Sequence, residues 1–544
     1  MERYETRRID HLGIVAGVCR EIGLIEQVDQ RVKASERKVS CGKAVQALVL
    51  NALGFTSRAL YLVPDYLKNR PVDVLVGEGL SAADLNDDTL GRGLDDLYES
   101  GVTEVFAGVA SRALQVYGIE HRFVHLDSSS LHVHGKYEGE RGEESDEDRQ
   151  LITITEGYSK DHRPDLKQAV VELITSQGSS IPIWLEALDG NSSDRVSFPK
   201  TVQAYCRLLG ESDQPYYVMD SAGYSEDNLK AMEKIHWLTH VPETLKQARE
   251  LVAETQKTDM QSLEEGYWGK EVTSRYGSIQ QRWLVVYSEA AQRREERGLE
   301  RKQAKELETA GIQWRKLMAE KFNCQADAEQ ALAQFNQKLH YYQAQATLEV
   351  HSRYAHPGRP GSEDQPQVLY YQLRGELNPN PVALEKTRST FGKFILATNE
   401  MDTQALSTRE MLSHYKEQSV SVERGFRFLK DPLFFAHSLF LKSPARMMAL
   451  IMVMGLALLI FALAERQLRL RLKQQNVTIP SQTGKPTQTP TMRWVFQMFE
   501  GIDLLLILQD EQVVQRQVLN LSPNHLQIIR LLGVQVQNCY SPPK

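Results

Sequence analysis

The stretch Phe123-Val-His-Leu-Asp-Ser-Ser-Ser130 decides the fold. It is a short apolar run that ends in an acid, and Tyr216-Tyr-Val-Met-Asp220 repeats the pattern further along the chain. Both runs have the length and composition of buried strands. Open α/β sheets place their sites at the carboxyl ends of strands, so Asp127 and Asp220 are predicted to mark such an edge.

A third acid, Glu423, lies in a segment with helical periodicity, Ser421-Val-Glu-Arg-Gly-Phe-Arg-Phe-Leu-Lys430. The spacing i, i+3, i+4, i+7 places four of its residues on one helix face: Glu423, Phe426, Arg427 and Lys430. Two acids on strands and one on a helix would form a cage of hard oxygen ligands. Such a cage suits Mg²⁺ or Mn²⁺, the ions used in phosphoryl transfer.

Five segments, in this order along the chain, resemble the DDE-class insertion-sequence transposases, and among these the bacterial subgroup with a Tyr…Glu…Lys signature. The segments are His125–Ser130, Gly157–Lys167, Val218–Tyr224, Phe394–Asn399, and Tyr415–Gln418 with Glu423 and Lys430. The resemblance implies an α/β, ribonuclease-H-like mixed-sheet core with a helical insertion, preceded by an α-helical domain. It also implies that Asp127, Asp220 and Glu423 are the catalytic residues and hold two Mg²⁺ (or Mn²⁺) ions.

The same resemblance assigns DNA contacts on the glutamate helix. In relatives the residues corresponding to Tyr415 and Lys430 touch DNA phosphates near the cleaved end, and lysine suits this as a point charge. The subgroup has an arginine four residues before the glutamate, where this chain has Ser419, and Tyr415 lies eight residues before the glutamate instead of seven. The phosphate contact of that arginine is missing here or passes to Arg424 or Arg427.

Two further groups of polar residues have competing interpretations. In the Gly157–Lys167 segment, Lys160 and Arg163 are predicted phosphate contacts, and a loop fixed by its own Asp and Pro is the alternative. A set of three histidines suggests zinc: His125, His132 and His134. No cysteine or other spaced ligand accompanies them, so packing or support of neighbouring ligands is the preferred interpretation.

The patterning divides the chain into six segments. They are 1–110, an α-helical N-terminal domain for DNA-end binding or oligomerisation; 120–288, the first part of the core; 289–392, an insertion with a helical hairpin; 393–474, the last part of the core with the glutamate helix and a buried apolar helix; 475–491, a linker; and 492–544, a small C-terminal segment. Within the core the predicted order is strand 123–127, strand 151–156, strand 181–188, helix 195–209, strand 216–219, helix 225–235 and strand 237–241.

The run 447–464 has eighteen uncharged residues and reaches the lower length limit of a membrane span. Cations flank it on both sides, so it gives no clear orientation in a membrane. Helices that are apolar all round are often buried in a protein core. We therefore expect it to pack behind the glutamate helix, with an integral membrane protein as the alternative.

Composition is that of an ordinary globular protein, with 544 residues, 41% hydrophobic and 25% charged. The five cysteines form no CxxC pair, and no apolar signal core follows the N-terminus, so we expect no secretion. The net charge of −7 opposes phosphate binding, but the acids gather in 137–149, a solvated loop, while cations gather after the third acid. Lys430 and the basic stretch Arg466–Lys473 are predicted to bind the DNA backbone.

Together these features predict a cytoplasmic, nucleoid-associated bacterial transposase that acts at the terminal inverted repeats of its element and on target DNA. It would act as a homodimer on DNA, without a membrane. A catalytically dead DNA-binding derivative is the alternative. Its mark would be loss of one of the three acids, and all three are present.

Overall fold

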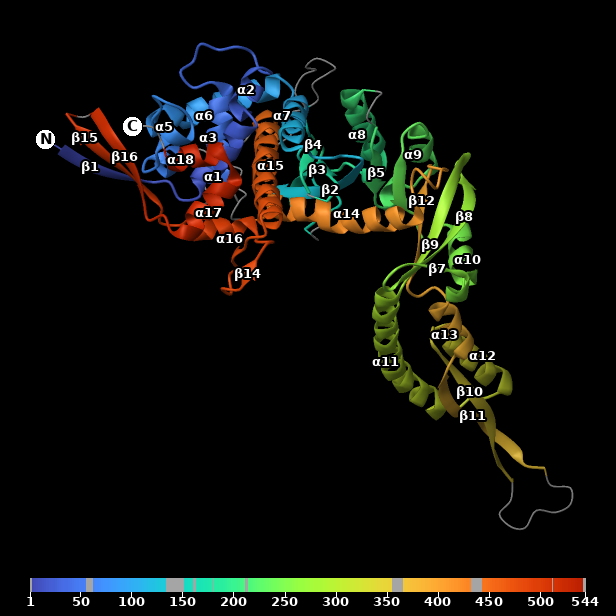
Figure 1. Cartoon of the computed structure of the whole chain (residues 1–544). Coiled ribbons are helices and arrows are strands. Elements are labelled where there is room, and N and C mark those ends of the chain that lie inside the picture. The colour runs from blue at the N-terminus through green and yellow to red at the C-terminus, as the bar shows by residue number, and fades with distance from the viewer. Residues whose placement is uncertain are drawn as a thin grey trace. The chain divides into compact units, whose positions relative to one another are not determined.

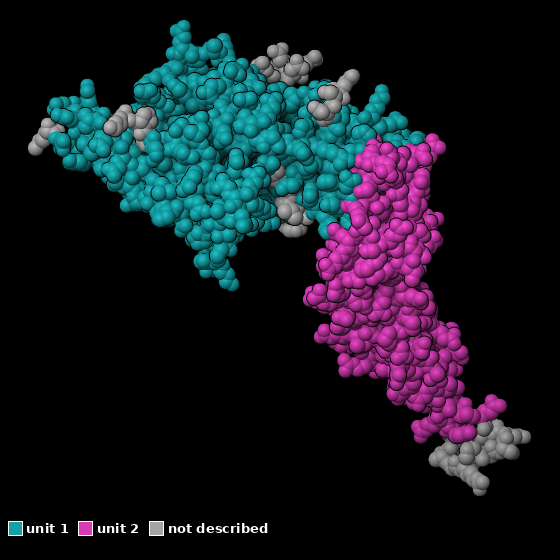
Figure 2. All heavy atoms as spheres, viewed as in Figure 1, with its two compact units in different colours: residues 1–239, 276–279, 410–544 teal, residues 240–275, 280–409 magenta. Residues whose placement is uncertain are grey.

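The computed structural model forms two compact units (Figure 2). Unit 1 comprises residues 1–239, 276–279 and 410–544, and unit 2 comprises residues 240–275 and 280–409. The described residues are 2–54, 62–133, 151–159, 163–178, 180–210, 214–354, 365–431, 443–510 and 512–541, without the side chains of 419–421. The predicted residues Lys160 and His134 lie outside the described residues.

The core of unit 1 is a sheet with the strand order β4-β3-β2-β5-β6. Its strands are β2 (Phe123–Val133), β3 (Lys167–Ser176), β4 (Pro182–Leu188), β5 (Tyr216–Met219) and β6 (Trp237–His240). β3 pairs antiparallel with both β2 and β4, and β5 and β6 continue the sheet in parallel with β2. Parallel neighbours need crossovers, which α8 (Asp194–Leu209) and α9 (Glu226–Ala231) supply. This order confirms the predicted ribonuclease-H-like core.

The predicted second core strand, 151–156, is wrong, because β3 takes that place in the sheet. Within 151–156 only an isolated bridge forms, between Thr155 and Gln168. β3 was not predicted because polar residues interrupt its apolar run. Two of them, Gln168 and Glu172, are fully buried in the structure. Burial raises the pKa of Glu172 to about 7, and the Thr201 hydroxyl donates a hydrogen bond to its carboxylate. The strand is therefore polar in sequence and buried in position.

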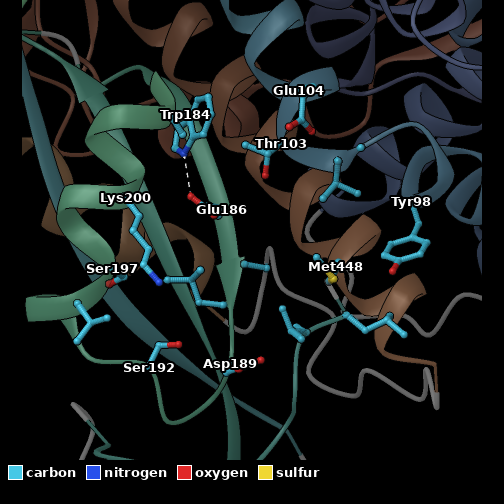
Figure 3. Close-up of a pocket in the computed structure, with 18 of the residues that line it drawn as sticks. Tyr98, Thr103, Glu104, Trp184, Glu186, Asp189, Ser192, Ser197, Lys200 and Met448 are labelled. Carbon is cyan, nitrogen blue, oxygen red and sulfur yellow. Dashed lines mark hydrogen bonds between the residues drawn. The ribbon is translucent and has the colours of Figure 1, made fainter. Parts of the chain in front are cut away.

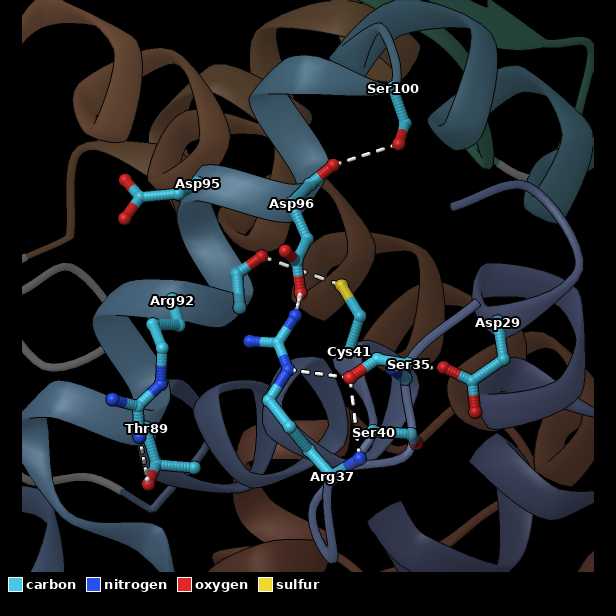
Figure 4. A network of polar contacts seen from close by, with 12 residues as sticks. Asp29, Ser35, Arg37, Ser40, Cys41, Thr89, Arg92, Asp95, Asp96 and Ser100 are labelled. Carbon is cyan, nitrogen blue, oxygen red and sulfur yellow. Dashed lines mark hydrogen bonds and ion pairs between the residues drawn. The ribbon is translucent and has the colours of Figure 1, made fainter. Parts of the chain in front are cut away.

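Helices form most of the first 117 residues of unit 1. They are α1 (Leu12–Glu21), α2 (Leu24–Asp29), α3 (Cys41–Ala52), α4 (Val63–Leu67), α5 (Val72–Leu75), the short 3₁₀ helix η2 (Ala82–Leu85), α6 (Asp87–Glu99) and α7 (Val102–Tyr117). Polar contacts fix the start of α3: the Ser40 side chain accepts from Lys43 N as N-cap, and Asp29 accepts from Gly42 N at 2.7 Å. Arg37 pairs with Asp96 and so links this part of the chain to α6 (Figure 4).

The N-terminal helices share a small sheet with the C-terminal segment. Strand β1 (Glu2–Arg8) pairs antiparallel with β15 (Asp503–Gln509), which pairs with β16 (Gln512–Leu519), so the blue and red ends of the chain meet in Figure 1. The helices α17 (Pro523–Leu532) and α18 (Val534–Tyr540) complete this part, and α18 packs on α1. A purely helical start was therefore wrong, since β1 finds its partner some 500 residues away in the sequence.

Gly17 allows α1 and α18 to approach each other closely. A Cβ at this position would lie 2.6 Å from the Val536 Cα, a backbone atom that cannot move aside. We expect Gly17→Ala to lower the free energy of unfolding by about 1–3 kcal/mol, as overpacking does. Denaturant unfolding of the purified chain measures this.

Gly311 provides the matched control, because a Cβ there meets nothing within 4 Å. Gly311→Ala should raise stability by up to about 1 kcal/mol through helix propensity alone. The two variants thus have opposite expected signs. Equal effects would show that the contact between α1 and α18 is not tight in solution.

The predicted linker 475–491 contains a small ordered hairpin. Strands β13 (Ile479–Pro480) and β14 (Pro486–Thr487) pair, and Pro480 O accepts a hydrogen bond of 2.8 Å from the Trp494 indole on α16 (Met492–Met498). Pro-rich composition here marks a tight turn, not an extended spacer.

The apolar run lies in α15 (Pro444–Gln474), which is long and apolar enough to cross a membrane and has 83% of its most apolar window buried inside the fold. It packs against α3, α6, α7 and β4, and Gly455 permits the contact with β4, since a Cβ there would lie 2.5 Å from Leu185. Phe461 contacts Phe428 of α14 (Thr408–Leu429) with ring centroids 5.0 Å apart. The expected packing behind the glutamate helix is confirmed.

Unit 2 has its own strands in the order β12-β9-β8-β7. They are β7 (Gln261–Glu264), β8 (Tyr267–Tyr276), β9 (Ile279–Ser288) and β12 (Lys393–Thr398), with α10 (Lys246–Glu254) and α13 (Pro381–Arg388) beside them in sequence. The region 289–392 holds the helices α11 (Glu289–Ala319) and α12 (Gln325–Gln337). Beyond the predicted helical hairpin, the region also contains a strand pair, because β10 (Tyr342–Arg353) pairs antiparallel with β11 (Gln367–Pro379).

Candidate active site

The two aspartates lie side by side on neighbouring strands. In the parallel pair β2 and β5, the register ends with His125 opposite Val218; two residues further along each chain come Asp127, inside β2, and Asp220, directly after β5. Residues two apart in a strand point to the same face, so both carboxylates leave the face of the sheet that carries His125. Asp127 accepts a hydrogen bond of 2.7 Å from Ser128 N, and Asp220 caps a 3₁₀ turn by accepting 2.9 Å from Ala222 N.

Helix α14 covers this face of the sheet. His414 stacks on Phe123 of β2 with ring centroids 3.6 Å apart, and the Gln418 amide lies 3.5 Å from Leu126 O. Burial raises the pKa of the Tyr415 hydroxyl to about 12, and the negative charge of Asp220 adds to the shift. Tyr415 therefore lies close to Asp220, and the helix passes directly over both aspartates.

Glu417 fastens α14 to β2 through two histidines. Its carboxylate lies 3.8 Å from the buried His125 and 3.3 Å from His414. These two neighbours, His125 first, lower the pKa of Glu417 to about 2, while burial lowers that of His125. Glu417 has no role that its sequence context reveals, because its partner His125 lies nearly 300 residues earlier and only the fold brings them together.

Glu423 lies one and a half turns further along α14, and its side chain is exposed. The turn that carries it crosses β3 at Leu173, since a Cβ on Gly425 would lie 2.8 Å from that side chain. Leu173 is the strand partner of Asp127, so this turn passes beside the aspartates. Among the described residues, however, no three acidic, histidine or cysteine side chains are close enough to share one ion. The structure aligns the two aspartates and leaves the glutamate outside their group.

The expected helix face around Glu423 is only partly confirmed. Glu423 and Arg427 are exposed and Lys430 is half-buried, whereas Phe426 is buried. Arg424 forms an ion pair with the buried Glu465 of α15, so its charge is used inside the fold. Of the two arginines proposed to replace the missing one, Arg427 is therefore the better placed for a phosphate.

The basic stretch Arg466–Lys473 is divided between the core and the surface. Arg469 pairs with Glu465 at 3.0 Å and donates to Pro490 O at 2.8 Å, and burial lowers its pKa. Burial also lowers the pKa of Arg466, while Arg471 and Lys473 are exposed. Arg469 is half-buried and paired within the fold, so it is less available to a phosphate than the exposed Arg471 and Lys473, and DNA binding by the stretch stays a prediction.

Arg163, the other predicted phosphate contact, forms a bidentate pair with Asp165 at 2.7 and 2.8 Å. Both side chains are largely exposed, so the pair is weak and can be broken by a competing phosphate. His132 bonds to Ser159 at 2.9 Å, at the base of the same loop. The hydrogen bond of His132 to Ser159 is consistent with a packing role, which is the preferred interpretation, and not with a role as a zinc ligand.

A separate cavity of about 450 Å³ lies between α7, β4 and α8 (Figure 3). Lys200 of α8 and Glu186 of β4 both line it, and the Trp184 indole donates to Glu186 at 3.4 Å. None of the predicted site residues is among its lining residues. The cavity is therefore distinct from the aspartate pair.

The donor set of the aspartate pair suits a divalent cation. Asp127 lies inside β2, so the predicted strand end at this residue is wrong, because β2 continues to Val133; Asp220 directly follows the last residue of β5. Both carboxylates are hard oxygen ligands on a rigid scaffold. The turn of α14 that crosses Leu173 carries Glu423, which among the described residues does not join the two aspartates in one ligand group. A ribonuclease-H-like core with such a pair of carboxylates defines a class of metal-dependent phosphoryl-transfer enzymes.

Comparisons with known proteins agree with this class. The family described as "Transposase DDE domain" matches residues 119–460, and the family described as "Domain of unknown function (DUF4277)" matches residues 4–111. The chain belongs to the transposase DDE family and is a DNA transposase, an enzyme of a family that uses divalent metal ions. No curated protein matches the chain. Among solved structures, a piggyBac transposase synaptic complex with hairpin DNA aligns over 91% of this chain and 82% of that chain, with 10% identity and a TM-score of 0.37.

Proposed function

We propose that this transposase belongs to the subgroup with the Tyr…Glu…Lys signature and cuts and joins DNA at the terminal inverted repeats of its element. Asp127, Asp220 and Glu423 are the proposed ligands of two Mg²⁺ ions. The observation that carries this proposal is the register that sets Asp127 beside Asp220 beneath α14. Bound ions would supply charge stabilisation for an in-line displacement at phosphorus.

The chain's own residues have separable tasks in this proposal. The two aspartates present their carboxylates from fixed positions in β2 and directly after β5, and the contact of Glu417 with His125 holds α14 on this face of the sheet. Tyr415, with its proton retained at neutral pH, offers a hydroxyl near Asp220. Arg427 and Lys430 present positive charge on the last turns of the same helix to a DNA backbone, and Lys160 and Arg163 are the proposed contacts on the loop.

We further propose a homodimer on DNA, acting in the bacterial cytoplasm at the nucleoid. The activity is tested by incubating the purified chain and Mg²⁺ with a labelled duplex from the inverted repeats that flank the gene. The expected products are a nick with a free 3′-hydroxyl at the element end and, with added target DNA, a joined strand. Absence of both products from a correctly folded, DNA-bound chain would reject the proposed reaction.

Lys430→Ala is expected to weaken end binding because it removes one phosphate contact. The slope of log affinity against log salt should fall by about 0.9. A salt series in a gel-shift assay measures the slope.

Lys430→Arg should keep most of the slope, because the positive charge remains. Lys230→Ala removes an exposed cation on α9 that already pairs with Glu226, and it should leave the slope unchanged. An unaltered slope for Lys430→Ala would place the DNA track elsewhere.

A further inference from the structure

Helix α11 of unit 2 presents mostly cations on its outer side, although the exposed Glu300 and Glu308 lie three residues after Arg297 and Lys305. Its buried side, which carries Leu299, Ala310 and Trp314, packs on β10 and β11. On the opposite side four exposed cations follow the spacing i, i+3, i+7, i+11, which is one line along a helix. These residues form the basic face: Arg294, Arg297, Arg301 and Lys305.

Several acids of α11 that could neutralise this face are engaged elsewhere in the fold. Glu295 accepts a hydrogen bond of 2.7 Å from Gly392 N, and Glu296 pairs with Arg388 at 2.8 Å. Glu306 accepts from His340 N and Tyr341 N, both at 2.7 Å. These three carboxylates hold neighbouring segments in place instead of pairing with the outer cations.

Within the described part of the chain, no acidic side chain lies within ion-pair distance of any residue of the basic face. The usual solvated helix alternates signs so that i, i+4 pairs form, and this face lacks them. Four like charges along about 16 Å repel one another and gain from an anionic partner of similar length.

A glycine in the same face leaves room for close approach. Gly298 lies between Arg294 and Arg301 along the helix, and a Cβ at this position would meet nothing within 4 Å. No internal packing therefore requires glycine here, although glycine weakens a helix interior. The absence of a side chain at Gly298 would allow the backbone of a binding partner to approach the helix closely.

We propose that the basic face of α11 binds the phosphate backbone of double-stranded DNA. Duplex DNA carries one phosphate per about 3.4 Å along each strand, which matches a line of cations better than a discrete acidic peptide does. The contact is independent of base sequence, since phosphates carry no sequence information. The inference rests on the proposed action on DNA and adds a binding surface remote in sequence from the three acids.

The test compares the full-length chain with a variant in which Arg294, Arg297, Arg301 and Lys305 are all replaced by Gln. Affinity for a duplex of arbitrary sequence is measured across a potassium chloride series. The slope of log affinity against log salt should fall by about 0.9 for each cation that no longer binds a phosphate, up to about 3.6 for the four. Gly298→Leu, which keeps every charge, should also weaken binding, because the side chain occupies the open space.

A charge-matched control replaces four exposed lysines on other elements by Gln: Lys33, Lys234, Lys338 and Lys485. It has the same net charge as the first variant and should keep the wild-type slope. A basic-face variant with normal circular dichroism and an unchanged slope would overturn the proposal. So would a change in oligomeric state without DNA, which would assign the face to a second copy of the chain.

Cleavage of the element end separates this inference from the proposed function. If wild type binds and cuts the duplex and the basic-face variant binds equally well, only the inference about α11 fails. If wild type binds no duplex at all, both fail.

Discussion

Replacing Asp127 or Asp220 by Asn, or Glu423 by Gln, is expected to reduce strand cleavage at the element end by at least about 10³-fold. Each change removes one anionic ligand, and metal-assisted charge stabilisation is worth several kcal/mol in the transition state. The amide variants suit this test because Asn can still accept the hydrogen bonds from Ser128 N and Ala222 N. The loss should therefore come from charge and not from a distorted strand edge.

The measurement pairs cleavage of labelled end DNA in Mg²⁺ with a gel-shift assay on the same preparations. Binding should stay within a few-fold of wild type, because none of the three residues is a phosphate-binding cation. Asp227→Asn, at an exposed position in the first turn of α9, is the matched control and should cleave normally. Cleavage by any of the three variants at the wild-type rate would remove that residue from the catalytic set.

Glu423 gives this experiment its sharpest outcome. The register of β2 and β5 fixes Asp127 beside Asp220, whereas Glu423 is exposed and forms no three-residue group with them among the described side chains. If Glu423→Gln loses cleavage as fully as the aspartate variants, the glutamate joins the pair in the working complex. If only the aspartates matter, the third ligand comes from elsewhere.

The parts of the fold that could be predicted are those encoded locally. Asp127 and Asp220 each follow an apolar run whose burial drives strand formation, so adjacent residues in the sequence predict both the strand and the position of the acid. The helix carrying Glu423 starts at Thr408, directly after Ser407, and serine is a residue type that favours the start of a helix. These features depend on a few adjacent residues and not on distant partners.

What could not be predicted depends on contacts between distant residues. The first residues are predicted to belong to the α-helical N-terminal domain, and they form strand β1 only because β15 offers them an edge to pair with. Arg424 reads as a free cation until Glu465 is placed beside it. Glu417 likewise has no evident role until His125 lies 3.8 Å away. Charged residues are ambiguous in sequence because the same side chain can bind a ligand or close an ion pair within the fold.

Leu456→Asp is expected to prevent folding. Leu456 lies in the middle of α15 and is fully buried, so the carboxylate would lose its hydration without gaining a partner. Even Leu456→Ala should cost about 2–5 kcal/mol through the cavity it leaves. The whole domain is held by only about 5–15 kcal/mol, and a buried unpaired charge costs more than a cavity. The measurement is the yield of folded, DNA-binding protein in the supernatant after high-speed centrifugation.

Leu470→Asp on the same helix is the matched control, because Leu470 is 37% exposed and a carboxylate there stays hydrated. This variant should fold and bind DNA as wild type does. The two variants and the wild-type chain together distinguish burial in the protein from insertion in a lipid bilayer. If α15 spanned a membrane, the wild-type chain would sediment with the washed membranes. Packing of α15 against α3, α6, α7 and β4, with Phe461 on Phe428 of the glutamate helix, requires the wild-type chain to remain in the supernatant.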